Sequence, residues 1–302
     1  MSNSMVSRFP KWIRRSWSAP DGVIATRGVL EDLRLHTVCR SARCPNRSEC
    51  WQRRTATFMI LGGQCTRNCS FCAVAHGRPE NVEEDEPARI AEAVKRLELR
   101  HVVVTSVTRD DLPDGGAYHF AATVEAIRGG CPGVRIEVLT PDFQGREQAI
   151  RTVLASGPDV FGHNIETVAR LHPAVRDARC SYERSLAVLH LVADEAPGII
   201  VKSSLMAGLG ETDMEIRQTL RDLRVAGCGA VCIGQYLQSG PRQRPVEQFV
   251  PLEAFKRYET WAYAMGFSFV AAGPFVRSSY HADQVWTSHG STEKSTAAAG
   301  KF

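Results

Sequence analysis

The sequence lacks several features that would assign it to common classes of protein. No apolar run reaches the roughly 20 residues that a membrane-spanning helix needs, so we expect a protein that does not span the membrane. No secretory signal precedes a small, cysteine-dense domain, which disfavours a disulfide framework for the ten cysteines. The net charge of +4 is too small to indicate a nucleic-acid partner by itself.

Familiar zinc and nucleotide patterns are also incomplete. A structural zinc site usually needs four ligands, often two C-x-x-C pairs or one such pair with two histidines. Only Cys69 and Cys72 form a C-x-x-C pair, and no histidine stands at zinc-finger spacing. The histidines form no H-E-x-x-H motif, and Gly208-Leu209-Gly210 lacks the third glycine of a dinucleotide fingerprint. These absences disfavour a zinc finger, a zinc protease and an NAD-binding protein.

What the chain does contain is two groups of three cysteines. The first group, spaced C-x4-C-x5-C, consists of Cys39, Cys44 and Cys50. The second, spaced C-x3-C-x2-C, consists of Cys65, Cys69 and Cys72. Three thiolates on a short loop leave a four-position soft-metal site one ligand short. Two iron–sulfur clusters, each with one iron open to another ligand, fit best; zinc is the main alternative, and disulfides come last.

From residue 55 onward, short apolar segments alternate with amphipathic stretches of helical length. Strands are predicted at 55–61, 101–107, 135–140, 159–163, 198–205 and 230–236. Helices are predicted at 86–98, 117–128, 145–155, 181–194, 211–226 and 251–265, with a further helix-like stretch at 28–35. This alternation predicts a parallel sheet with right-handed crossovers, either doubly wound or barrel-like. Polar or glycine-rich loops after most strands favour a barrel or partial barrel.

Active sites of such barrels are built from the loops that follow the strands. The second cysteine group follows the first predicted strand, and the carboxylate- and glycine-rich segment 105–117 follows the second. His163 follows the fourth strand, where we expect a structural role. Other candidates at or after the fourth, fifth and sixth strands are Asn164, Glu166, Lys202, Gln235 and Tyr236. The four remaining cysteines show no ligand spacing and are interpreted as small apolar core residues: Cys131, Cys180, Cys228 and Cys232.

Residues 62–72, which read GGQCTRNCSFC after the strand-like segment 55–61, resemble the signature of radical S-adenosylmethionine (SAM) enzymes. The aromatic Phe71 directly before the third cysteine is part of that pattern. In this superfamily, three cysteines hold a [4Fe–4S] cluster whose fourth iron binds the amino and carboxylate groups of SAM. The resemblance implies an α/β fold, an open (β/α)6 partial TIM barrel with an N-terminal cluster-binding extension and a C-terminal extension.

The paired cysteine groups resemble those of lipoyl synthases. So do Glu49-Cys50-Trp51 leading into 56–60, and Arg277-Ser278-Ser279-Tyr280 near the C-terminus. Four further blocks fit as well: 109–116, 163–167, 208–212 and 234–237. The resemblance extends from about residue 12 to residue 282. Two small departures, Gly162 where many relatives have asparagine and Ser204 where many have glycine, lie outside the cysteine motifs.

The resemblance implies a role for each group. Cys65, Cys69 and Cys72 would hold the SAM-cleaving cluster, and Cys39, Cys44 and Cys50 would hold an auxiliary [4Fe–4S] cluster together with Ser279. A serine alkoxide is a harder ligand than thiolate and should release iron more readily, which suits a cluster that is dismantled. The implied reaction inserts two sulfur atoms, at C6 and C8 of a protein-bound octanoyl-lysine, and uses two SAM molecules per lipoyl group. Residues expected to contact SAM are Asn164, Glu166, Lys202, Gln235, Tyr236 and the Asp110–Gly116 loop.

The same resemblance implies the partners. These are octanoylated lipoyl carrier domains (2-oxoacid dehydrogenase acyltransferase subunits and the glycine cleavage H protein), a ferredoxin or flavodoxin as low-potential electron donor, and iron–sulfur carrier proteins. No nucleic acid or membrane is involved. We expect a cytoplasmic protein, because oxidants would release iron from ligating thiolates. A basic, acid-free arm carries Arg8, Lys11, Arg14 and Arg15; we interpret it as a surface for an acidic carrier domain rather than a transit peptide.

Three parts are expected: 1–54 as the N-terminal arm and auxiliary cluster segment, 55–265 as the radical SAM partial barrel, and 266–302 as the C-terminal extension.

Two other functions remain open. One is a different radical SAM enzyme with an auxiliary cluster, which modifies peptides or inserts sulfur elsewhere. The other is an iron–sulfur or zinc protein without catalytic activity, such as an electron carrier or redox sensor.

Overall fold

The computed structural model describes residues 10–13, 21–54, 56–280 and 282–285. Arg8, Arg14 and Arg15 of the basic arm therefore lie outside the described residues, as does most of the C-terminal extension beyond the Arg277–Tyr280 motif. No helix among the described residues has both the length and the apolar character needed to cross a bilayer.

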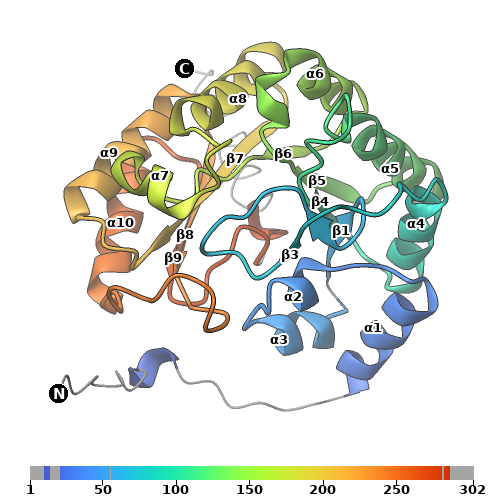
Figure 1. Cartoon of the computed structure of the whole chain (residues 1–302), viewed down its shortest axis with the longest axis horizontal. Helices are drawn as coiled ribbons and strands as arrows, with labels where there is room; N and C mark the ends of the chain where they lie inside the picture. The colour runs from blue at the N-terminus through green and yellow to red at the C-terminus, as the bar shows by residue number, and fades with distance from the viewer. Residues whose placement is uncertain (1–9, 14–20, 55, 281, 286–302) are drawn as a thin grey trace, which may run out of the picture.

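A curved sheet of parallel strands forms the centre of the molecule (Figure 1). Its strands, in spatial order, are β1 (Thr57–Ile60), β4 (His101–Ser106), β5 (Arg135–Leu139), β6 (Val160–Gly162), β7 (Ile200–Ala207), β8 (Ala230–Gln235) and β9 (Phe269–Gly273). The helices between them are α4 (Glu86–Arg96), α5 (Ala117–Gly130), α6 (Glu147–Ala155), α8 (Tyr182–Glu195), α9 (Asp213–Val225) and α10 (Leu252–Ala264). These helices lie outside the sheet, so both faces of most strands are buried, as parallel sheets require. The predicted α/β partial barrel is confirmed.

The sheet has a seventh strand that the sequence pattern did not indicate. β9 pairs in parallel with β8, with Ala230 opposite Phe269 and Gly234 opposite Gly273. Its sequence, FVAAG, has little of the β-branched character typical of strands, which is why the pattern missed it. The barrel sheet therefore continues past residue 265 into the predicted C-terminal extension, 266–302.

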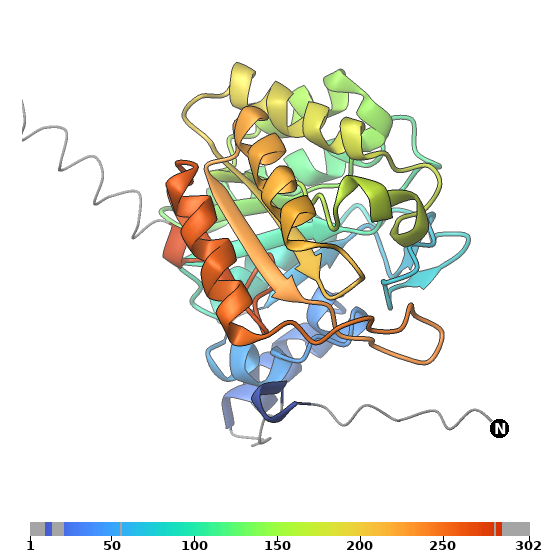
Figure 2. The same cartoon turned by 90° about the vertical axis from the view of Figure 1, so that its left-hand side faces the viewer.

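The two edge strands, β1 and β9, do not pair with each other among the described residues, so the barrel is open. Three helices of the N-terminal segment lie along this open side in both views: α1 (Asp21–Asp32), α2 (Val38–Ser41) and α3 (Arg47–Gln52) (Figures 1 and 2). Thr37 forms an antiparallel bridge with Phe58 at the outer edge of β1. The N-terminal segment therefore covers the edge that the missing strands of a closed barrel would occupy.

Side-chain hydrogen bonds join this N-terminal segment to the chain that follows β9. Asn46 Nδ2 donates to the carbonyl of Phe275 at 2.7 Å, and the Tyr280 hydroxyl donates to Glu49 Oε1 at 2.9 Å. Both bonds connect residues more than 200 positions apart in the sequence. The open side of the barrel is thus closed by two segments that hold each other, and not by a strand ladder.

Candidate functional site

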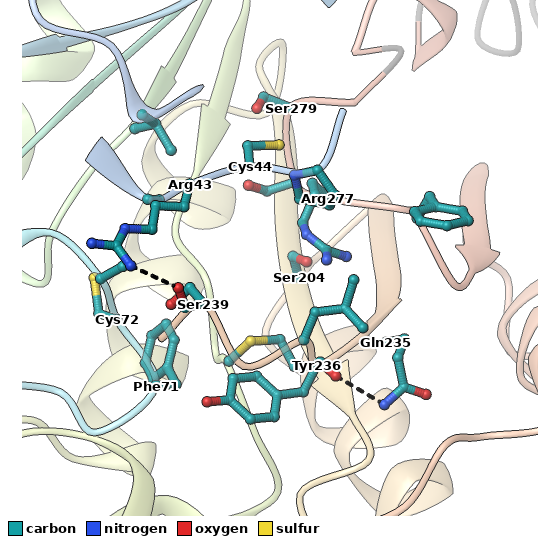
Figure 3. Close-up of a pocket in the computed structure, with 18 of the residues that line it drawn as sticks. Arg43, Cys44, Phe71, Cys72, Ser204, Gln235, Tyr236, Ser239, Arg277 and Ser279 are labelled. Carbon is teal, nitrogen blue, oxygen red and sulfur yellow. Dashed lines mark hydrogen bonds between the residues drawn. The ribbon is translucent and has the colours of Figure 1, made fainter. Parts of the chain in front are cut away.

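A cavity of about 800 Å³ lies at the open side of the barrel and is lined by thiols of both cysteine groups (Figure 3). Cys39 and Cys44 reach it from the N-terminal segment, and Cys72 reaches it from the loop after β1. Ser279 lines it from the segment after β9. Figure 3 shows Ser279 beside Cys44 at one end of the cavity, with Cys72 on another wall. The fold therefore brings together four predicted ligands from three separate parts of the chain.

The loop of the second cysteine group begins at the short strand β2 (Gln64–Cys65), which pairs with β3 (Ala75–His76). The Cys65 sulfur accepts backbone N–H groups of Arg67 and Thr108, each at 3.4 Å. The Cys69 sulfur accepts the backbone N–H of Asp177 at 3.3 Å. Such bonds favour the thiolate form and tune the reduction potential of a bound cluster.

Arg67, which lies between the first two cysteines of this loop, anchors it to the barrel. Its side chain is 2% exposed and binds both carboxylate oxygens of Asp110, each at 2.8 Å, and Asp142 Oδ1 at 2.7 Å. Burial opposes ionisation of Asp142, but the hydrogen bond from Arg67 lowers the pKa of this carboxyl group to about 2. Sequence reasoning missed this role. The arginine within the cysteine motif was visible, but its partners lie 43 and 75 positions away.

A second anchor holds the other side of the same loop. Asp177 Oδ2 accepts the backbone N–H of Asn68 at 2.8 Å, and Arg179 Nη2 donates to the carbonyl of Thr66 at 2.6 Å. Arg179 and Asp177 also pair with each other, which holds the pKa of Asp177 well below its usual range. The loop is therefore held in place by barrel residues on both sides of the cysteines.

The first cysteine group is carried by two short helices instead. Cys39 lies in α2, Cys50 lies in α3, and Cys44 lies in the turn between them, where its N–H donates to the carbonyl of Cys39. Ser279 approaches this turn from the other segment, and its Oγ accepts a hydrogen bond from Thr57 Oγ1 at 2.9 Å. Thr57 is a second functional candidate that the sequence did not single out, since nothing in its local pattern distinguishes it from other strand residues.

The chemistry of these thiols fits a cluster better than a single metal ion. Burial raises the pKa of Cys50 to about 12 and that of Cys72 to about 11, so both thiols release protons only when metal binds. A cubane takes each thiolate on a different iron, and three cysteines leave one iron open to another ligand, as each cysteine group here would. The donor set therefore suits [4Fe–4S] clusters.

Four of the five residues expected to contact SAM line the cavity: Asn164, Glu166, Gln235 and Tyr236. Glu166 adopts a left-handed backbone conformation with φ of +66°, which is uncommon outside glycine, and its carboxylate accepts a hydrogen bond from Asn164 at 3.2 Å. Burial raises the pKa of Glu166, and the Arg176 guanidinium opposes this shift. An inward-facing carboxylate of this kind can accept hydrogen bonds from amino or hydroxyl groups.

Gln235 and Tyr236 are already hydrogen-bonded within the protein. Gln235 Oε1 accepts the backbone N–H of Val250 at 2.8 Å, and its Nε2 donates to the carbonyl of Gln248 at 3.0 Å. The Tyr236 hydroxyl donates to the carbonyl of Arg244 at 2.6 Å. Their side chains therefore shape the wall by holding residues 244–250. Further lining residues include Arg43, Ser204, Met206, Leu237 and Arg277.

Two predicted SAM contacts lie elsewhere. Lys202 does not line the cavity; its ammonium group is 2% exposed and binds both oxygens of Glu137, at 2.9 and 3.0 Å. It lies in the first half of β7, whereas the cavity is lined by later residues of that strand, so the structure does not bring Lys202 to the cavity. The Asp110–Gly116 loop also contributes no lining residue. Asp110 binds Arg67, and Asp114 accepts the N–H groups of Gly116 and Tyr118 at the start of α5.

The structural role expected for His163 is confirmed. This buried imidazole makes hydrogen bonds through both ring nitrogens, to the Thr140 carbonyl at 2.9 Å and to Ser185 Oγ at 3.1 Å. Cys180, in contrast, is not an apolar filler. Its sulfur accepts hydrogen bonds from Arg67 at 3.2 Å and from Arg176 at 3.5 Å, beside the loop of the second cysteine group.

Several known proteins are similar to this chain in sequence. A sequence model of the Radical SAM superfamily matches residues 59–223. A lipoyl synthase from Thermus thermophilus is 54% identical over 92% of this chain and 86% of its own length. Lipoyl synthases from Caldanaerobacter subterraneus (52% identical, 92% of this chain, 97% of its own length) and Pyrobaculum arsenaticum (51%, 93% and 96%) are also similar.

Two solved structures share the fold at low sequence identity. Streptococcus suis SuiB bound to S-adenosylmethionine matches with a TM-score of 0.56 and 10% identity, over 76% of this chain and 54% of the SuiB chain. Methylornithine synthase (PylB) matches with a TM-score of 0.52 and 12% identity, over 85% of this chain and 83% of its own. At these identities the likeness concerns the arrangement of strands and helices only.

Proposed function

Since this chain belongs to the lipoyl synthase family of the radical SAM superfamily, we propose that its two cysteine groups divide the work of sulfur insertion between them. The chain is a radical SAM sulfurtransferase that uses a [4Fe–4S] cluster and SAM. The observation that carries the proposal is the single cavity lined by thiols of both groups and by Ser279. A non-catalytic electron carrier or redox sensor would not need these groups to face one enclosed space.

Cys65, Cys69 and Cys72 hold the SAM-cleaving cluster in this proposal, and Cys39, Cys44, Cys50 and Ser279 hold an auxiliary [4Fe–4S] cluster. When bound, the SAM-cleaving cluster supplies the electron that cleaves SAM to a 5′-deoxyadenosyl radical, and the auxiliary cluster supplies the sulfur atoms. The protein positions the reacting groups and excludes water, and no acid–base pair is required for hydrogen abstraction from carbon. The Arg67 and Asp177 anchors keep the second cysteine group in one geometry through both SAM cleavages.

Glu166 and Asn164 are the candidates for orienting SAM. They line the cavity, and the half-buried carboxylate of Glu166 would accept hydrogen bonds that a ribose hydroxyl or the SAM amino group would otherwise make with water. Tyr236 and Gln235 hold the wall beside them, and the backbone of this wall is placed to meet an adenine ring.

The octanoyl chain has an apolar path to the auxiliary site. Val38, Met206, Leu237 and Phe275 line the same cavity, whose volume of about 800 Å³ accommodates a cofactor and an acyl chain. Its position at the open side of the barrel suits access for an acyl-lysine arm. The partners in this proposal are octanoylated lipoyl carrier domains, a low-potential electron donor and iron–sulfur carrier proteins, in the reducing cytoplasm. Docking through the basic arm predicts turnover that falls with added salt.

An anaerobic single-turnover assay with an octanoyl-lysine peptide tests the proposal. The assay measures 5′-deoxyadenosine and thiolated peptide in the same sample. We expect Ser279→Ala to produce 5′-deoxyadenosine without dithiolated peptide, whereas Ser278→Ala, its matched neighbour, retains both. Dithiolated peptide formed at the wild-type rate by Ser279→Ala would contradict the assigned ligand set.

A further inference from the structure

The chain that follows β8 contacts the supports of both cysteine groups. We name residues 236–245 the bridging segment. Its first four residues, 236–239, line the large cavity together with Cys44 and Cys72. Figure 3 shows the side chain of Arg43, which directly precedes Cys44, pointing towards Ser239 of this segment. The bridging segment therefore lies at the wall where the two groups meet.

Two neighbouring residues of the bridging segment hold the loop of the second cysteine group. The backbone N–H of Arg244 donates to the carbonyl of Ser70 at 2.8 Å, and Gln243 Nε2 donates to the carbonyl of Cys72 at 3.1 Å. The N–H of Ser70 donates in turn to the carbonyl of Val175 at 3.0 Å. The backbone from Ser70 to Cys72 is therefore held between the bridging segment and the barrel.

The turn of the first cysteine group reaches the same segment through Arg43. Its Nη1 donates to the carbonyl of Ser239 at 3.1 Å, across 196 positions of sequence. The backbone of Arg43 is left-handed, with φ of +51°, which is uncommon outside glycine. Such a conformation costs free energy and persists where the surrounding structure holds it, often at functional sites. The bond to Ser239 therefore ties a strained turn beside Cys44 to the bridging segment.

The two contacts meet within the bridging segment at Gly240. A methyl group on the Gly240 Cα would lie 2.9 Å from Gln243 Oε1 and 3.1 Å from Arg43 Nη1, so both side chains pack against this glycine. Gln238 Nε2 also donates to the carbonyl of Gln243 at 2.8 Å, which closes the segment on itself. A displacement of the Arg43 contact is therefore passed on to Gln243, because no free space separates the two side chains from Gly240.

We propose that Arg43 and Gln243 are positioning residues, which hold the two cysteine groups through the bridging segment at the separation that sulfur insertion requires. This inference rests on the proposed function, because it needs two clusters that face one cavity. The substrate carbon must meet the sulfur donor within that cavity, and a displacement of about 1 Å between reacting groups can cost about a hundredfold in rate. Neither side chain takes part in a bond-forming step; both act through the segment that they hold.

The test uses the full chain with both clusters reconstituted under anaerobic conditions. Arg43→Met and Gln243→Glu each remove one donor with little change in size, whereas Arg43→Lys keeps a donor. The matched control is Arg242→Met, which changes an exposed arginine of the same segment. Thermal unfolding and iron analysis identify the variants that are folded and loaded. Arg43 is exposed, so its replacement should leave the fold intact.

Pulsed EPR of protein with both clusters reduced measures the magnetic dipolar coupling between them, which falls with the cube of their separation. We expect one narrow distribution of couplings for the wild type, Arg43→Lys and Arg242→Met. Arg43→Met and Gln243→Glu should give a broader distribution, because one contact that fixes the separation is lost. A loss of stability alone does not change the coupling within the folded protein.

The single-turnover assay then gives the amount of 5′-deoxyadenosine formed per dithiolated peptide. We expect this ratio to rise about fivefold in Arg43→Met and in Gln243→Glu, as for one lost hydrogen bond. The double variant should show no more than the larger single change, because both residues act through one segment.

Unchanged dipolar coupling or an unchanged ratio in folded, loaded Arg43→Met overturns the inference. An equal change in Arg242→Met does so as well, and so does a double variant in which the two effects multiply. Wild-type protein that forms no thiolated peptide, or that holds one cluster, would instead refute the proposed function itself.

Discussion

The two cysteine groups have the same number of thiols but different supports. The second group lies on a loop that the barrel holds through buried ion pairs, with Arg67 bound to Asp110 and Asp142. The first group lies on short helices that are tied across the open side of the barrel by single hydrogen bonds, such as that from Tyr280 to Glu49. The comparison teaches that one site is built to keep its geometry, whereas the other is closed by contacts that can separate. This difference matches the proposed roles of the two sites, a permanent radical generator and a sulfur source that is spent.

Removing one thiol from either group in turn should distinguish the functions of the two sites most clearly. We expect Cys69→Ala to abolish both 5′-deoxyadenosine and thiolated product, because no ligated iron remains to bind SAM. Cys44→Ala should retain 5′-deoxyadenosine formation and lose the thiolated product. Iron and sulfide analysis of anaerobically purified protein should give about eight of each per chain for wild type and about four for either variant. Loss of SAM cleavage in well-folded Cys44→Ala would remove the distinction between the sites.

Removing the buried anchor should damage only the second site. Arg67→Leu removes the closest cation from Asp110 and Asp142, which among the described residues keep only the cations of Arg179 at 3.3 Å and Arg184 at 3.5 Å. We expect the free energy of unfolding to fall by up to the about 3–5 kcal/mol that is typical of a broken buried ion pair. We expect urea denaturation to show this loss, together with poor cluster content in the second group. The control is Arg179→Ala, whose half-exposed side chain should cost far less. Equal losses in the two variants would show that the anchor has no special role.

Lower pH should decrease the free energy of unfolding through His163, a buried residue of the barrel. Burial lowers the pKa of His163 to about 4, from about 6.5 in the unfolded chain. Between these values the unfolded state binds a proton that the folded state excludes, so stability is complete above about pH 6.5 and falls as the pH decreases towards 4. Between pH 7 and pH 5 this amounts to about 2 kcal/mol. In urea titrations of the cluster-free protein, His163→Gln should show a correspondingly smaller decrease; the same pH dependence in both proteins would contradict this assignment.

The smallest effect concerns the first group. Thr57→Val removes the hydroxyl that holds Ser279, a loss of about 1 kcal/mol, and should slow dithiolation by roughly fivefold without changing 5′-deoxyadenosine formation. Thr57→Ser keeps the hydroxyl and serves as the control. If both variants slow dithiolation equally, packing at β1 is responsible and not the hydrogen bond.

A site residue could be predicted from the sequence where the pattern that marks it lies within a short segment of the chain. The cysteine groups were predicted because metal ligands are particular residue types at short spacing, whereas Ser279 was predicted only from the resemblance of the Arg277–Tyr280 motif to a known family. Asn164 and Glu166 were found because they follow a predicted strand, where barrel sites are built. Lys202 was expected at the cavity but pairs with Glu137, because a lysine inside a strand can face a ligand or a buried carboxylate and only the position of Glu137 on β5 distinguishes the two.

The sequence alone determined the type of metal site and the parallel α/β barrel, since both depend on spacing within a few tens of residues: thiols in a loop, apolar runs in strands, amphipathic periods in helices. Tertiary structure alone decided which residues meet. It placed Thr57 against Ser279, Arg67 against two distant aspartates, and β9 beside β8. Such contacts join residues that are far apart in the chain, and burial gives them their energetic weight only after the whole barrel has formed.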